Sequence, residues 1–176
     1  MYPKKGEFYF RVRPEVQKRM LEIKRIGQQI GAPSARTEIK ELKNLDLNGF
    51  IIAVGALVCT KDGKFVFVRQ KYLPSLWESP GGGVDRRETI LEAVVREVKE
   101  ETGLDSRVCK LIRVWISSHE YKILSMKFLV EATGGKLMPM DPDGDTIEAK
   151  AFERKDVPVE KLRYQDDKDY LEKMSE

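Results

Sequence analysis

The sequence lacks the features of several large classes of protein. Its longest apolar stretch, residues 50–59, is about half the ~18 residues that a membrane-spanning helix needs, so we expect no membrane partner. The basic residues at the N-terminus have no apolar segment behind them, and we expect no secretory signal. Only two cysteines occur, Cys59 and Cys109, both in apolar runs typical of strands. We expect buried free thiols, which fits a cytoplasmic location.

Charge is abundant but unevenly distributed. The 176 residues are 41% hydrophobic and 35% charged, which excludes collagen-like, low-complexity and strongly disordered chains. The net charge of +3 is too small to indicate nucleic-acid binding by itself. The first 49 residues carry 11 Lys and Arg against 6 Asp and Glu, whereas the other 127 carry 21 against 23. We therefore predict a basic N-terminal extension, residues 1–48, followed by one catalytic domain, residues 49–176.

The extension contains one predicted helix. Pro14 suits its first position, and Gly31 suits the position just past its end. Apolar residues recur between them at helical spacing, at Val16, Met20, Ile23 and Ile30. This pattern is typical of an amphipathic helix that packs on the domain, and the alternative is a basic arm that attracts phosphates.

From residue 50 onward the pattern predicts an α+β fold. An Asp-Gly turn at 62–63 joins two apolar runs into a β-hairpin. Residues 71–88, rich in Pro and Gly, are predicted to form a loop. The predicted strands are 50–58, 65–68, 108–116, 123–130 and 147–152, with a helix at 89–102 and short helices within 159–174. The expected architecture is a mixed sheet with a helix on its face.

The helix at 89–102 has clear signals at both ends. Thr89 and Glu92 form a capping box, and Gly103 can take the left-handed conformation that ends a helix. At 100° per residue, one stripe of this helix is apolar and should face the core; it consists of Leu91, Val94, Val95 and Val98.

A neighbouring stripe of the same helix is acidic. Glu97, Glu100 and Glu101 lie within a turn and a half, and each like-charged pair at this spacing costs an isolated helix ~0.2–0.5 kcal/mol. The negative end of the helix dipole also disfavours Glu100 and Glu101. Either this face is solvated or it binds a cation, and oxygen ligands at this density suit Mg2+ or Mn2+.

The segment ahead of the helix favours the second possibility. Residues 77–83 end in three consecutive glycines, whose backbone can approach a ligand closely and present N–H and C=O groups. An anion-compatible loop that leads into an acidic helix is typical of metal-bridged phosphate chemistry.

This segment matches the Nudix box, Gly-x5-Glu-x7-Arg-Glu-U-x-Glu-Glu-x-Gly-U, where U is aliphatic. The nine matching positions are Gly82, Glu88, Arg96, Glu97, Val98, Glu100, Glu101, Gly103 and Leu104. Over roughly residues 50–160 the chain resembles the Nudix hydrolase family of MutT-like pyrophosphohydrolases. It departs from many members at Arg87, where they have glycine, and at Ala151 and Phe152, where they have two aromatic residues.

The resemblance implies a Nudix-type mixed sheet sandwiched by helices, and hydrolysis of a diphosphate by water attack at phosphorus. The substrate would be a nucleotide, a nucleotide sugar or a dinucleoside polyphosphate, and the cofactor Mg2+ or Mn2+. By position, the metal ligands are the carbonyl of Gly81 and the carboxylates of Glu97, Glu100 and Glu101. Glu88 would brace the loop, Arg96 would orient Glu97, and Gly82 and Gly103 are structural.

The general base varies within the family. It would be a box glutamate, Glu97 or Glu100, or a later carboxylate, with Glu148 ahead of Glu120.

The sequence also leaves two alternatives for the residues that contact the substrate. The segment at Trp77 resembles the corresponding segment of members that cleave ADP-ribose. Tyr121, in contrast, lies where members acting on dinucleoside polyphosphates have a tyrosine. No proline occurs in 105–138, which disfavours ADP-ribose. His119, the only histidine, is either a plain loop residue or a contact to phosphate or base.

Three other functions compete with small-molecule hydrolysis. A nucleotide-sensing binding module would have a broken box, and an isoprenoid diphosphate isomerase would need a protonating pair that often includes a cysteine near the site. An RNA 5′-end pyrophosphohydrolase could use the basic extension to follow phosphates, with a strong dependence on salt. A homodimer is a further possibility that the resemblance suggests.

Overall fold

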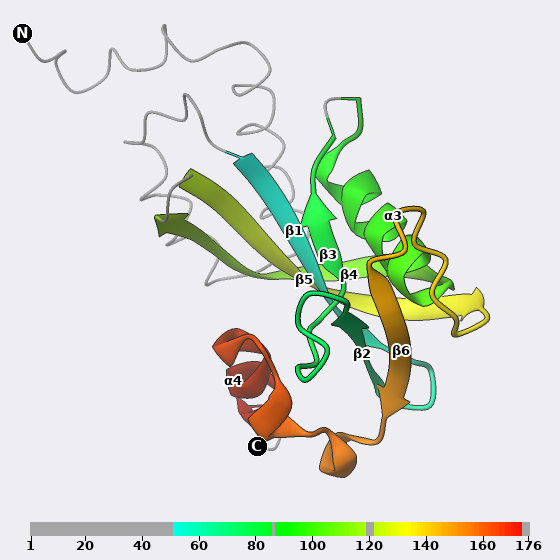
Figure 1. Ribbon diagram of the computed structural model, residues 1–176. Helices are drawn as coiled ribbons and strands as arrows, with labels where there is room; N and C mark the ends of the chain where they lie inside the picture. The colour runs from blue at the N-terminus through cyan, green and yellow to red at the C-terminus, as the bar shows by residue number, and fades with distance from the viewer. Residues whose placement is uncertain (1–50, 86, 119–121, 174–176) are drawn as a thin grey trace, which may run out of the picture.

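The computed structural model of the protein describes residues 51–85, 87–118 and 122–173 (Figure 1). The predicted extension, with its helix at 14–31, lies outside the described residues, as do His119, Glu120 and Tyr121.

The described chain forms one mixed sheet of six strands. The strands are β1 (Ile51–Cys59), β2 (Phe65–Gln70), β3 (Gly81–Gly83), β4 (Leu104–Ser118), β5 (Lys122–Gly135) and β6 (Thr146–Phe152). Their order is β4-β5-β1-β2-β6, and β3 also pairs with β1. The β1–β5 pair is parallel and the other pairs are antiparallel. The predicted α+β class and mixed sheet are confirmed.

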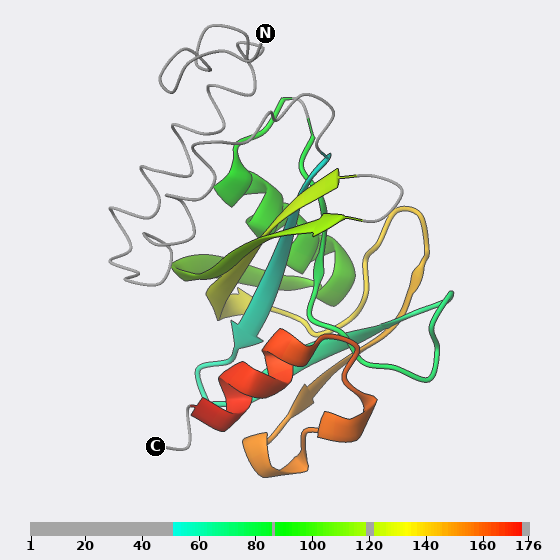
Figure 2. The same ribbon diagram turned by 90° about the vertical axis from the view of Figure 1, so that its left-hand side faces the viewer.

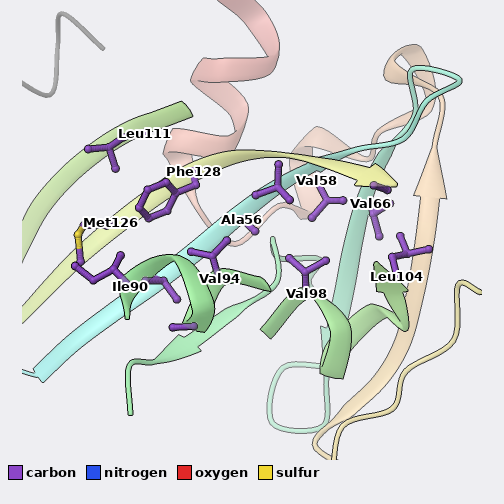
Figure 3. Packing of buried hydrophobic residues seen from close by; sticks show 14 of the residues in the cluster. Ala56, Val58, Val66, Ile90, Val94, Val98, Leu104, Leu111, Met126 and Phe128 are labelled. Atoms are coloured by element: carbon purple, nitrogen blue, oxygen red, sulfur yellow. The ribbon is translucent and has the colours of Figure 1, made fainter. Parts of the chain in front are cut away.

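The sheet lies between two helices, α3 (Ile90–Thr102) and α4 (Gln165–Lys173), with short 3-10 turns at Arg154–Asp156 and Val159–Lys161 (Figures 1 and 2). Alternate residues of each strand point to opposite faces. On the α3 side, Val94 and Val98 pack on β1 and β5 (Figure 3). The core on the α4 side contains Leu57, Phe65, Phe67, Trp77, Phe152, Val157, Leu162 and Leu171.

Helix α3 begins and ends as predicted. The Thr89 side chain accepts the Glu92 N–H, the Glu92 side chain accepts the Thr89 N–H, and Gly103 has φ of 75°. One prediction about its faces is wrong, because Val95 is 37% exposed. The helix is rotated so that Ala93, Glu97 and Glu101 lie against the sheet instead.

Two further expectations are corrected. Residues 81–83 are not a free loop: they form β3, at a spacing so close that a Cβ on Gly81 would lie 2.2 Å from the Val54 carbonyl oxygen. Cys109 is exposed because it lies at an irregularity of β4, and Cys59 is half-buried. Among the described residues, no helix has the length and apolar character needed to span a membrane.

Candidate active site

An acidic cleft of about 500 Å³ opens between α3, β3 and the loop before β6. The charged residues that line it are Asp85, Arg96, Glu97, Glu100, Glu101, Asp141, Asp143 and Asp145. Seven carboxylates therefore share the cleft with one guanidinium. A diphosphate would be repelled from such a cleft unless cations accompanied it.

Glu101 is the most deeply placed carboxylate of the box. It is 7% exposed, and its Oε2 accepts the Gly81 N–H at 2.9 Å. Its Oε1 accepts a hydrogen bond from the Gln70 amide and lies 3.3 Å from the Thr146 hydroxyl. Burial raises the pKa of Glu101 to about 7, although these uncharged donors partly oppose the shift.

Arg96 connects the other three carboxylates of the box. Its Nε and Nη2 donate to Glu88 at 3.0 and 2.7 Å, and its Nη1 donates to Glu97 at 2.8 Å and to Glu100 at 2.9 Å. It also binds the Gly83 carbonyl at 2.9 Å. Glu88 in turn accepts the Asp85 N–H at 2.9 Å. The loop before α3 is thus tied to the helix through one arginine.

Glu97 is held from two sides. Burial raises its pKa, and the Arg96 charge opposes that shift. A Cβ on Gly82 would come within 2.5 Å of the Glu97 Oε1. A side chain at position 82 would therefore displace the Glu97 carboxylate, which occupies the space of its Cβ.

These residues fit a divalent cation. Over the described ranges, no three His, Cys, Asp or Glu side chains are already gathered as a closed metal cage. In this arrangement Arg96 donates to Glu97 and Glu100, and Glu101 accepts the Gly81 N–H. Glu97 and Glu101 are nevertheless buried carboxylates with raised pKa values, and a cation would favour their charged forms. A donor set made only of oxygen suits Mg2+ or Mn2+.

Two candidate residues lie away from this cleft. Glu148 on β6 forms an ion pair with Arg69 on β2 and does not line the cleft. Trp77 is buried in the α4-side core, edge-on to Phe152 at 4.9 Å, with the Arg69 guanidinium 4.8 Å from its ring.

The loop before β6 was missed as part of the site. Its Asp-Pro-Asp-Gly run is typical of a turn, and Asp141 stabilises that turn by accepting the N–H groups of Asp143, Asp145 and Thr146 at 2.9–3.0 Å. The same turn places Asp143 and Asp145 in the cleft wall. Three aspartates in five residues were the signal.

A second cleft, of about 400 Å³, continues from the first toward α4. The two share Tyr72, Gly81 and Gly82. Its floor includes the small residues Ala53, Gly55 and Ser125, and its walls carry the aromatic and charged residues Tyr72, Glu78, Arg113, Trp115, Lys127, Arg163, Tyr164 and Asp166. Arg113 lies over the Trp115 ring at 5.5 Å, and Arg163 lies over the Tyr164 ring at 5.0 Å.

The fold is of the α+β class, with a mixed sheet between two helices and an arginine-braced acidic cleft beside a glycine strand. The NUDIX domain family matches residues 49–174, and the chain belongs to this family.

Its relatives include hydrolases of two kinds. The chain is 35% identical over 128 residues to an ADP-ribose pyrophosphatase of Methanocaldococcus jannaschii, covering 68% of this chain and 72% of that protein. It is 31% identical over 94 residues to an RNA pyrophosphohydrolase of Actinobacillus pleuropneumoniae, covering 53% of this chain and 44% of that protein. The chain thus spans less than half of the RNA pyrophosphohydrolase.

Solved structures share the fold. A MutT NUDIX hydrolase from Burkholderia pseudomallei aligns with a TM-score of 0.57 and 25% identity, over 70% of this chain and 96% of that one. A NUDIX hydrolase from Nitrosomonas europaea aligns with a TM-score of 0.60 and 20% identity, over 69% of this chain and 70% of that one. The second likeness supports the fold alone.

Proposed function

We propose that the protein hydrolyses the diphosphate of a nucleoside diphosphate linked to a second group, with Mg2+ as cofactor and ADP-ribose as the first candidate substrate. The observation that carries this proposal is the junction of two clefts at Gly81 and Gly82. One cleft is acidic and suits a metal-bound diphosphate, and the other is aromatic and suits a nucleoside. The similarity to an ADP-ribose pyrophosphatase supports ADP-ribose over the dinucleoside polyphosphates that Tyr121 favoured.

The aromatic cleft has the features that a nucleobase requires. Tyr72, Trp115 and Tyr164 offer rings for stacking, and small residues on the floor leave space for a planar group. Base–aromatic stacking contributes roughly 1–3 kcal/mol per base. The volume of the aromatic cleft, about 400 Å³, also falls within the range usual for ligand pockets.

The acidic cleft has residues for each part of the reaction. Glu97, Glu100, Glu101 and the Gly81 carbonyl would hold the metal, whose contribution when bound is to neutralise charge on the diphosphate and to lower the pKa of water. Arg96 keeps Glu97 and Glu100 oriented. A carboxylate in the cleft takes a proton from the water as its oxygen bonds to the phosphorus of the second group. The bridging P–O bond breaks, the nucleoside monophosphate leaves with the bridging oxygen, and the second group is released as its phosphate. Glu97, Glu100, Asp143 and Asp145 are the candidate bases.

The second candidate substrate is RNA with a 5′-triphosphate. Lys110 and Arg113 lie along β4 between α4 and the aromatic cleft, with Lys110 5.5 Å from the Tyr170 ring. Alternating cations and rings suit a single strand that leads into the site. The similarity to RNA pyrophosphohydrolases points the same way.

The test is hydrolysis of a substrate panel by the full chain with Mg2+, with and without EDTA. The panel contains ADP-ribose, NADH, nucleoside triphosphates, dinucleoside polyphosphates and 5′-triphosphate RNA. We expect EDTA-sensitive conversion of ADP-ribose to AMP and ribose 5-phosphate. Salt-sensitive turnover of RNA alone would favour the second candidate. No turnover of any substrate with either Mg2+ or Mn2+ would contradict the proposed reaction and favour a binding module.

We also propose a cytoplasmic location, which the two free cysteines support. The homodimer stays a prediction.

A further inference from the structure

A lysine is buried at the boundary between the aromatic cleft and α4. Lys127 projects from β5, its side chain is 5% exposed, and its Nζ lies 2.5 Å from Asp167 Oδ1. The same ammonium donates to the Ser79 hydroxyl, and that hydroxyl donates to Asp167 Oδ2 at 3.0 Å. Lys127, Ser79 and Asp167 therefore form a closed ring of polar contacts, here termed the Lys127 cluster.

The Lys127 cluster contributes little net free energy to the stability of the fold. Asp167 is 1% exposed, and burial raises its pKa despite the neighbouring ammonium. Removing two charges from water costs about as much as their attraction returns, and apolar residues of similar volume often serve stability equally well. What such a cluster provides is a defined position for the groups that it joins.

The groups that it joins lead to the metal side of the site. Both hydrogen-bonding directions of the Ser79 hydroxyl are used, so its side chain is fixed. Two residues later, the Gly81 N–H is bound by Glu101. Between them, the Pro80 carbonyl accepts the Ala56 N–H at 2.8 Å. The segment 79–81 is thus held by α4 at one end and by α3 at the other.

The same cluster forms part of the aromatic cleft. Ser79 and Lys127 line it, together with Tyr164 and Asp166 from the segment that begins α4. The Lys127 ammonium lies 5.3 Å from the Tyr164 ring. A group bound in this cleft would therefore contact the residues that hold segment 79–81.

We propose that Lys127 and Asp167 are positioning residues, which act through Ser79 to set the place of Gly81 against Glu101 and so couple the aromatic cleft to metal binding. The inference rests on the proposed function for its catalytic consequence, but its effect on metal binding can be measured without turnover. Neither residue touches the reacting atoms in this scheme.

The test compares a double variant with a matched control on the same helix. Lys127→Met with Asp167→Leu replaces the ion pair by apolar groups of similar size. Asp169→Asn changes an aspartate of α4 that accepts a hydrogen bond from Gln165 at 2.9 Å and lines neither cleft. The measurements are the melting temperature, the affinity for Mn2+ alone, and kcat and KM with ADP-ribose.

We expect the double variant to melt close to the wild type, to bind Mn2+ at least 5-fold more weakly and to lose at least 10-fold in kcat, while the control keeps wild-type values. Wild-type Mn2+ affinity and kcat in a folded double variant would overturn the proposal. If the double variant does not fold, Ser79→Ala removes only the bridging hydroxyl, and unchanged Mn2+ affinity there would overturn it equally. If the wild type cleaves no substrate, the proposed function fails, while Mn2+ affinity still decides the role of the cluster.

Discussion

The titration of Glu101 should be visible in the stability of the metal-free protein. Burial raises its pKa to about 7 from an ordinary value of 4.5. Between those two pH values the folded protein keeps a proton that the unfolded chain has released, so the free energy of unfolding falls as pH rises. Each pH unit corresponds to ~1.4 kcal/mol. Over the span of about 2.5 pH units, the free energy of unfolding therefore falls by up to about 3 kcal/mol. This contribution is present in full below pH 4.5 and is lost above pH 7.

The matching variant is Glu101→Gln, which cannot ionise. Its amide can still accept the Gly81 N–H, and the Gln70 amide can rotate to offer its oxygen, so little bonding is lost. Urea unfolding in EDTA, at intervals from pH 5 to 8, measures the free energy of unfolding of both proteins. Asp167, whose pKa is also raised, titrates in both proteins and cancels in the difference, whereas the charge of Glu97 helps to raise the Glu101 pKa and so contributes to the difference.

We expect the variant to gain about 3 kcal/mol over the wild type at pH 8 and less than about 1 kcal/mol near pH 5. Adding Mg2+ at pH 8 should stabilise the wild type more than the variant, because only the wild type presents this carboxylate. If the free energies of unfolding of the two proteins ran parallel across the whole pH range, the raised pKa of Glu101 would be refuted. The same variant should lose at least ~10²-fold in turnover, and near-normal activity would remove Glu101 from the metal ligands.

Three further substitutions test other parts of the structure. Val94→Asp places a charge in the α3-side core and should unfold the domain, as seen by circular dichroism; a soluble, active variant would show that the helix face is misassigned. Gly82→Ala puts a Cβ 2.5 Å from the Glu97 carboxylate, so kcat should fall at least tenfold while the circular dichroism spectrum is retained; unchanged kcat would mean that Glu97 moves freely. Glu148→Gln should leave kcat nearly unchanged because Glu148 lies outside the acidic cleft, whereas a loss of ~10² or more would make it the general base.

The sequence by itself determined the features that depend on neighbours along the chain. Thr89, Glu92 and Gly103 set the ends of α3, since capping involves residues within one turn. The box also placed Arg96 next to Glu97 and one turn from Glu100, and the structure shows both ion pairs. Alternating apolar runs were enough to find five of the six strands, and the box identified the family.

Tertiary structure alone decided which faces these elements turn inward. The rotation of α3 on the sheet exposes Val95 and buries Glu101, an outcome that depends on packing against β1, β3 and β4. The pairing of β6 with β2 sends Glu148 to Arg69 instead of to the acidic cleft.

The remaining parts of the site also come from contacts between distant segments. The loop at 141–145 faces α3, and Asp167 meets Lys127 across 40 positions of the chain. Strand register and helix rotation are set by the packing of the whole core, so no local pattern could place these side chains together.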